Sequence, residues 1–178
     1  VSANPTGPLH LGHTRWAALG DSISRVLRAA GAEVVTEYYI NDAGAQMDKF
    51  GRSVLAAALG EEAPEDAYPG EYIRELGRKV LEQAPELPEL AARDRAAALE
   101  TAQELGYRQQ LSEIKDSLER FNVHFDVFFS ERTLHTPAEG GGKSPIEAAA
   151  DPLPEPGHVF DEDGAIWGRK TDFRHGKE

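Results

Sequence analysis

The chain has 178 residues, 40% of them hydrophobic, which is enough for one domain with an insertion. No apolar run approaches the length of a membrane-spanning helix, and the first residues lack the features of a secretory signal peptide. The sequence contains no cysteine, which excludes disulfides and thiolate metal sites and is typical of a reducing compartment. The formal net charge of −12 is unusual for a protein that approaches nucleic acid. Residues 61–105 hold 12 acidic and five basic residues, and we interpret this segment as a solvated helical surface.

A turn-rich loop opens the chain and ends in the run His10-Leu11-Gly12-His13. Histidines three residues apart share one face of the first helical turn, where backbone N–H groups also attract anions. Gly12 keeps the space between the two rings small. The run therefore predicts a phosphate-handling site at the start of a helix.

The residues that follow predict a helix over 14–30 and a strand over 34–40. The apolar residues of the helix recur on one face, as a stripe of Leu19, Ile23, Val26, Leu27 and Ala30. Gly31 is expected to cap the helix, and Asn41-Asp42-Ala43-Gly44 to form the turn after the strand. A loop, a helix and a strand in this order make half of a βαβ unit. We expect its first strand to precede Val1.

Beyond residue 45 the pattern becomes mostly helical. It gives three apolar faces, which are Met47, Phe50, Gly51, Val54, Leu55 and Ala58; Ile73, Leu76 and Val80; and Leu111, Ile114, Leu118 and Phe121. A strand is predicted over 125–129 and a hairpin over 159–167 with its turn at Asp163-Gly164. The prolines and glycines of residues 136–157 predict a flexible connector with at most a short helix over 146–150.

Several short sequence motifs resemble those of bacterial arginyl-tRNA synthetases, which are class I aminoacyl-tRNA synthetases. In family order they are His10-Leu11-Gly12-His13, Gly20-Asp21, Tyr38-Tyr39-Ile40-Asn41-Asp42-Ala43-Gly44 with Gln46, Tyr68-Pro69-Gly70-Glu71-Tyr72-Ile73, Phe125-Asp126-Val127-Phe128-Phe129-Ser130-Glu131, Gly164-Ala165-Ile166-Trp167 and Thr171-Asp172-Phe173. The first motif alone occurs in other nucleotidyl transferases. The whole set, which spans most of the chain, is specific.

The resemblance implies an α/β fold, namely the first half of a Rossmann-like class I synthetase catalytic domain with a mostly helical insertion. Residues 1–45 would form the first half of the nucleotide-binding fold, and residues 46–135 the helical connective insertion ending in a strand. Residues 136–157 would form the Pro/Gly-rich flexible connector. Residues 158–178 would hold a hairpin and a truncated carboxyl terminus. Because only one half of the fold is expected here, we expect no tRNA charging by the chain alone.

The resemblance also implies a function, which is to activate arginine with ATP and to transfer it from arginyl-adenylate to tRNA(Arg). ATP would be a substrate accompanied by Mg²⁺, with no protein-bound metal, and the full-length enzyme would be a cytoplasmic monomer that binds no membrane. The implied catalytic residues are His10 and His13, which with Leu11 and Gly12 also bind ATP. The implied amino-acid-binding residues are Ser2, Asn4 and His13, and further candidates at the strand end are Asn41, Asp42 and Gln46.

Alternatives remain open at this point. From the residues alone, Ser2 and Asn4 fit ordinary turn chemistry before Pro5 equally well, and Asn41-Asp42 fits a turn followed by a helix cap. Two other functions are possible, a non-catalytic synthetase-like binding module and a different His-x-Gly-His nucleotidyl transferase. Intact His10 and His13 argue against the first of these, and the longer motifs argue against the second.

Overall fold

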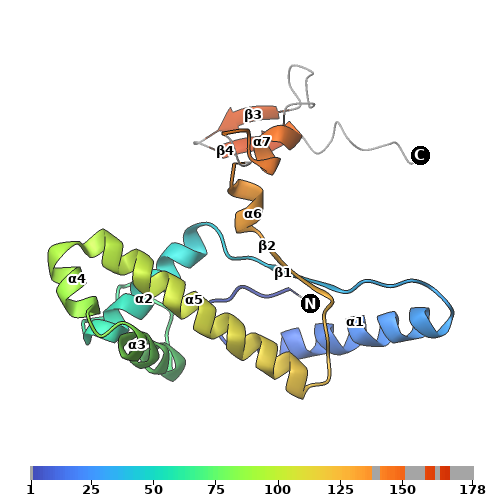
Figure 1. Cartoon of the computed structure of the whole chain (residues 1–178), viewed down its shortest axis with the longest axis horizontal. Helices are drawn as coiled ribbons and strands as arrows, with labels where there is room; N and C mark the ends of the chain where they lie inside the picture. The colour runs from blue at the N-terminus through green and yellow to red at the C-terminus, as the bar shows by residue number, and fades with distance from the viewer. Residues whose placement is uncertain (1, 138–140, 151–158, 163–164, 169–178) are drawn as a thin grey trace. The chain divides into compact units, whose positions relative to one another are not determined.

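The computed structural model describes residues 2–137, 141–150, 159–162 and 165–168, and the chain divides into two compact units, residues 1–131 and 132–178 (Figure 1). The first unit contains α1 (Leu11–Ala29), β1 (Glu37–Ile40), α2 (Ala45–Leu59), α3 (Glu71–Gln83), α4 (Leu87–Arg93), α5 (Arg95–Arg120) and β2 (Val127–Ser130). The second contains α6 (Arg132–His135), α7 (Pro145–Ala150), β3 (Val159–Glu162) and β4 (Ala165–Gly168).

Helix α1 confirms the first predicted helix and begins three residues earlier than the sequence pattern indicated. Its last turn closes in a Schellman motif, with the Gly31 N–H donating to the Arg28 carbonyl and the Ala32 N–H to the Leu27 carbonyl, both at 3.0 Å. Gly31 adopts a φ of 89°, a backbone conformation that residues with a Cβ atom rarely adopt. Gly31 therefore follows the capping residue, Ala30, instead of being the cap itself.

The apolar stripe of α1 faces away from the core of the first unit. Ile23 is 52% exposed and Val26 is 68% exposed, whereas the buried side chains of the helix are Ala17 and Ser24. At 100° per residue, Ala17 and Ser24 lie on the opposite side of the helix from the stripe. The helix thus packs within this unit through its small and polar side chains, which the hydrophobic pattern did not indicate.

Strands β1 and β2 pair in parallel, with Tyr38 opposite Phe128 and Ile40 opposite Ser130. The chain between them runs through α2–α5, because parallel strands need a long crossover connection. Both strands overlap the predicted ones, but β1 begins at residue 37 instead of 34, and β2 runs from 127 to 130 instead of 125 to 129. The core beside them consists of Ala3, Ala17, Tyr38, Ile40, Ile114, Leu118 and Val123.

Helices α2–α5 enclose a second apolar core, and here the predicted faces are confirmed. All six predicted residues of α2 and all three of α3 are buried. Gly77 of α3 lies so close to α2 that a Cβ would meet the Ala58 nitrogen at 2.7 Å. On α5, Ile114 and Leu118 are buried as predicted, but Phe121 caps the helix and is 47% exposed. The short α4 was not predicted.

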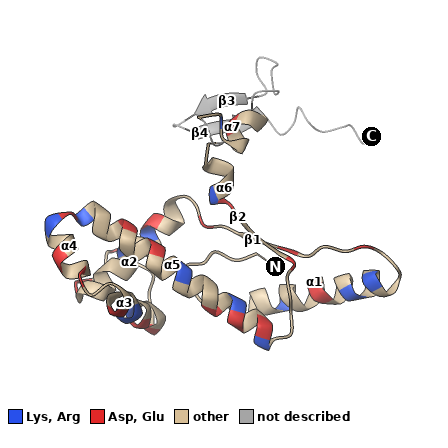
Figure 2. Cartoon of the chain, in the orientation of Figure 1, with Lys and Arg blue, Asp and Glu red and all other residues tan. Residues whose placement is uncertain are grey.

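Charged residues of both signs are distributed along α3, α4 and α5 (Figure 2), and most of those within residues 61–105 are exposed. Many of them pair one helical turn apart, as Arg78 does with Glu75 at 2.8 Å and Arg108 with Glu104 at 2.7 Å. Exposed pairs of this kind contribute only about 0.3–0.5 kcal/mol each.

In the second unit, α7 begins with a capping box that its sequence Ser144-Pro145-Ile146-Glu147 encodes. The Glu147 carboxylate accepts the Ser144 N–H at 2.8 Å, and the Ser144 hydroxyl accepts the Glu147 N–H at 3.3 Å. The short helix predicted over 146–150 is thereby confirmed. β3 and β4 form the predicted antiparallel hairpin, with Phe160 opposite Trp167. Its turn and residues 138–140 and 151–157 of the predicted connector lie outside the described residues.

No helix in the described ranges combines the length and the apolar character that crossing a membrane requires.

Candidate active site

The loop of residues 2–8 is anchored by two tyrosines that come from distant elements. Tyr38 of β1 is fully buried, and its hydroxyl lies 3.1 Å from the Ala3 nitrogen and 3.3 Å from the Ala3 carbonyl oxygen. Burial raises the pKa of Tyr38 to about 12, so its hydroxyl stays protonated and can donate. The Tyr72 hydroxyl of α3 donates to the Thr6 carbonyl at 3.0 Å. The loop is therefore fixed from both the sheet and the helical segment.

His10 and His13 form a reciprocal cap at the start of α1. The Gly12 N–H donates to His10 Nδ1 at 3.1 Å, and the His10 N–H donates to His13 Nδ1 at 3.4 Å. The two rings stack with their centroids 3.7 Å apart. A Cβ at residue 12 would lie 2.9 Å from His10 Cε1, so Gly12 leaves room for the His10 ring. The arrangement is a capping box built from imidazoles, which satisfies two N–H groups of the helix end.

These hydrogen bonds define which ring nitrogen carries the proton. An Nδ1 atom that accepts an N–H cannot itself be protonated, so each neutral ring carries its proton on Nε2. Burial, and after it the nearby charge of His10, lowers the pKa of His13, which favours its neutral form. The pair thus offers two Nε2–H donors beside the N-terminus of a helix, where an anion is already favoured.

The histidines line a hollow of about 370 Å³ together with Ser2, Gly12 and Trp16. Ser2 is held there because its hydroxyl donates to the Tyr39 carbonyl of β1. Trp16 lies one turn beyond His13 and is 65% exposed. The hollow therefore combines hydrogen-bond donors with one large aromatic surface.

The other predicted site residues gather where β1 ends. The Asn4 amide donates to the Gln46 side-chain oxygen, which joins the loop to the first turn of α2. Asp42 is 1% exposed, and its Oδ2 accepts the hydroxyls of Tyr107 at 2.8 Å and Ser130 at 2.7 Å. Its carboxylate thus connects the ends of β1 and β2 with α5, while Asn41 beside it is partly exposed.

A family model for the catalytic domain of class I tRNA synthetases of the arginine type matches residues 1–166. The chain belongs to this family. It is 56% identical over all its 178 residues to the arginine–tRNA ligase of Paenarthrobacter aurescens and 54% identical to that of Renibacterium salmoninarum. It spans 31% of the length of each of these relatives.

The fold agrees with a solved member of the family. A crystal structure from Campylobacter jejuni, assigned as an arginyl-tRNA synthetase, superposes with a TM-score of 0.77 at 33% identity. The match covers 97% of this chain and 37% of that one. The partial α/β, Rossmann-like fold class expected from the sequence is thereby confirmed.

The structure brings to the site three residues that the sequence pattern did not single out as functional, namely Trp16, Tyr38 and Tyr72. Trp16 follows His13 by three residues, so helical spacing alone places it on the same face. Tyr38 and Tyr72 belong to the sequence motifs that carry the family resemblance, but their contacts with residues 3 and 6 are long-range, and a local sequence pattern does not predict them.

Among the described residues, no group of histidine, aspartate and glutamate could hold a metal ion.

Proposed function

We propose that this chain supplies the signature-loop part of the active site of an arginine–tRNA ligase. In the first step, the carboxylate of arginine attacks the α-phosphorus of ATP, a bond to pyrophosphate breaks, and arginyl-adenylate forms. In the second step, the acyl group passes to the terminal ribose of tRNA(Arg) and AMP leaves. Such chemistry asks the protein mainly to position the reactants and to stabilise the charge that grows on the phosphoryl oxygens.

The observation that carries the proposal is the mutually capped pair His10 and His13 in its hollow. Both Nδ1 atoms are occupied by backbone N–H groups, so the Nε2–H groups are the donors left for the phosphoryl oxygens. Capping also fixes the rings before ATP binds, which removes the cost of orienting them in the transition state. We assign His10 and His13 as catalytic residues, and we assign the backbone from His10 to His13 to ATP binding.

We assign Ser2, Asn4 and His13 to the amino acid, because Ser2 lines the hollow with His13 and Asn4 follows two residues later in the same fixed loop. The Asn4–Gln46 contact supports placing Gln46 in the same subsite. Asn41 is proposed as a further contact. Because Asp42 is buried and its carboxylate already accepts two hydroxyls, we propose that it positions the strand ends and does not touch substrate.

The proposal includes ATP, arginine and tRNA(Arg) as partners of the full-length enzyme, a monomer of the cytoplasm, and it takes Mg²⁺ as part of the nucleotide substrate. The proposal takes its arginine specificity from the relatives in Paenarthrobacter aurescens and Renibacterium salmoninarum, which are both named arginine–tRNA ligase.

Replacement of both His10 and His13 by alanine in the full-length protein tests the proposal. We expect arginine-dependent ATP–pyrophosphate exchange to fall at least about a hundredfold, since removal of one preorganised donor typically costs about 2.7–4 kcal/mol. His124→Ala, an exposed histidine of the same unit, is the matched control and should leave the rate unchanged. Exchange within threefold of wild type in the double variant would refute the assigned roles. Binding of ATP and arginine without any exchange by the wild-type protein would favour a non-catalytic module.

A further inference from the structure

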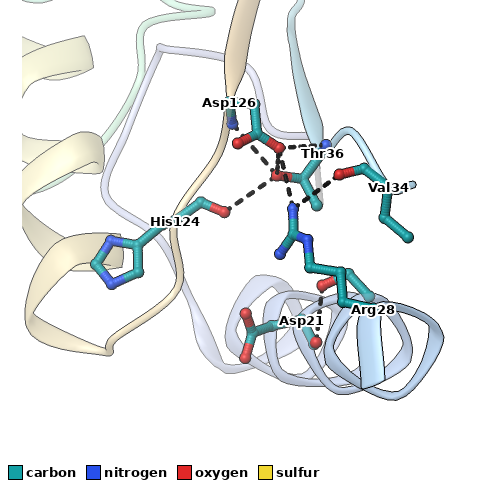
Figure 3. Close-up of polar contacts among 7 residues, drawn as sticks. Asp21, Arg28, Val34, Thr36, His124 and Asp126 are labelled. Carbon is teal, nitrogen blue, oxygen red and sulfur yellow. Dashed lines mark hydrogen bonds and ion pairs between the residues drawn. The ribbon is translucent and has the colours of Figure 1, made fainter. Parts of the chain in front are cut away.

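The carboxylate of Asp126, just before β2, collects hydrogen bonds from two other parts of the chain (Figure 3). Its Oδ2 accepts the Thr36 N–H at 2.7 Å, the Thr36 hydroxyl at 2.8 Å and Arg28 Nη2 at 3.2 Å. The backbone N–H of Asp126 in turn lies 3.2 Å from the Thr36 hydroxyl oxygen. We call Arg28, Thr36 and Asp126 the latch. It joins the last turn of α1 to the starts of both strands.

Hydrogen bonds from Thr36, first from its backbone and then from its side chain, lower the pKa of the Asp126 carboxyl, and the Arg28 charge adds to this effect. The carboxylate is therefore ionised at neutral pH, and its bonds to Thr36 are charge-assisted. The Arg28–Asp126 ion pair is about half exposed, so solvent screens it. The bonds between Thr36 and Asp126 are the stronger part of the latch.

Helix α1 depends on such polar contacts because it buries so little within the described residues. Ala17 and Ser24 are its buried side chains. Beyond Ala17, the helix is held by the buried Ser24 and by two arginines. Arg25 donates to the Asn122 carbonyl at 3.0 Å, and Arg28 donates to the Val34 carbonyl at 3.0 Å as well as to Asp126. All these contacts lie on the side of the helix opposite the exposed apolar stripe.

We propose that the latch is a positioning network for His10 and His13. The helix rises about 1.5 Å per residue, so Arg28 lies about 16 Å from the contact at Ala17 on one side, and the histidines lie about 6–10 Å from it on the other. A shift of about 1 Å at the latch therefore moves the imidazoles by about 0.5 Å. Since a misplacement of about 1 Å can cost about a hundredfold in rate, we expect about a tenfold loss when the latch opens.

The kinetic test rests on the proposed function and uses the full-length enzyme. Asp126→Asn and Thr36→Val should each lower kcat of ATP–pyrophosphate exchange about tenfold and leave the KM for ATP and arginine within twofold. Thr36→Ser keeps the hydroxyl and should retain the wild-type kcat. Asp66→Asn breaks an Arg–Asp pair of similar exposure on the helical segment and is the matched control. An unchanged kcat in both latch variants, or an equal loss in the control, would overturn the proposal.

A second measurement separates failure of the latch from failure of the proposed function. In the 178-residue chain, amide hydrogen exchange of residues 11–30 should speed up at least tenfold in Asp126→Asn, while residues 45–59 of α2 keep their protection. This result is expected whether or not the protein charges tRNA. Unchanged exchange in α1 would show that the latch does not hold the helix. If the wild-type enzyme is inactive although exchange in α1 responds to the variant, the proposed function and the kinetic role of the latch are both refuted, but the hold of the latch on α1 stands.

Discussion

Helix α1 and the helical segment α2–α5 are held in place by different kinds of contact. The helical segment encloses large side chains such as Phe50, Val54 and Leu87, each fully buried. Helix α1 turns its large side chains outward and is fixed by a buried alanine, a buried serine and a set of hydrogen bonds. The two regions therefore combine a core stabilised by apolar burial with a site-bearing helix stabilised by geometry-dependent polar contacts.

This difference bears on function. An apolar core tolerates small shifts because the hydrophobic effect has no direction, whereas a hydrogen bond weakens steeply as its geometry changes. The histidines lie on the element whose placement depends on direction. We infer that mutations in the two regions will have different effects. Mutations in the helical segment will mainly lower stability, and mutations around α1 will mainly lower the catalytic rate.

The largest expected effect comes from a substitution in the apolar core of the helical segment. Phe50→Ala should lower the free energy of unfolding by about 3–5 kcal/mol, because it empties a fully buried site beside Tyr68. Ile23→Ala in α1 should change it by no more than about 0.5 kcal/mol, since Ile23 is already half exposed in this chain. Urea unfolding followed by circular dichroism measures both. Equal losses would mean that α1 is packed as tightly as α2.

A pair of identical substitutions sharpens the same contrast. Gly77→Ala should destabilise the chain by about 2 kcal/mol, because the new Cβ would overlap the α2 backbone at Ala58. Gly20→Ala should instead stabilise it by about 0.5–1 kcal/mol, because nothing lies within 4 Å of that Cβ and alanine favours the helix. Thermal unfolding of the two variants should shift the midpoint in opposite directions. A shift in the same direction would contradict the packing described for one of them.

The same contrast explains how much of the fold the sequence predicts. The faces of α2 and α3 are predicted correctly because each finds its partner inside this chain, so periodicity and burial coincide. The stripe of α1 has the same periodicity, but it stays exposed among the described residues, and the pattern cannot show which face of the helix is buried. The short α4 lacks the length that a periodic signal requires.

The candidate site divides in a similar way. The run His10-Leu11-Gly12-His13 indicates a phosphate site from local spacing alone, and the capping geometry follows from that spacing. The contacts of Tyr38 with Ala3 and of Thr36 with Asp126 join residues 35 and 90 positions apart. The contact of Thr36 with Asp126 follows from the parallel register of β1 and β2, which begin one residue further on. The contact of Tyr38 with Ala3 follows from the packing of the N-terminal loop beside β1. No local pattern in the sequence encodes them.

A smaller effect tests the loop that leads to the histidines. Tyr38→Phe should lower the free energy of unfolding by about 1 kcal/mol, because it removes the hydroxyl that pairs with the backbone of Ala3. Tyr68→Phe is the control, since its ring packs on Phe50 and its hydroxyl makes no hydrogen bond described within residues 2–137. Urea midpoints of the two variants give the comparison. If the control lost as much as Tyr38→Phe, the ring environment and not the hydroxyl would be responsible.

The smallest expected effect concerns the pH dependence of the histidine cap. The folded-state pKa of His13 lies below its ordinary value of 6.5, first because of burial and then because of His10. Between the folded pKa and 6.5 the unfolded chain binds more protons, so stability rises with pH in this window and is lost as pH falls below about 6.5. His13→Gln keeps a side-chain acceptor at the third helical position but does not titrate. Urea unfolding at pH 5 and pH 7 should therefore show a larger loss of stability on acidification for wild type than for His13→Gln. Parallel losses would show that His13 does not titrate differently in the folded chain, and would remove the argument that burial and the charge of His10 favour its neutral ring.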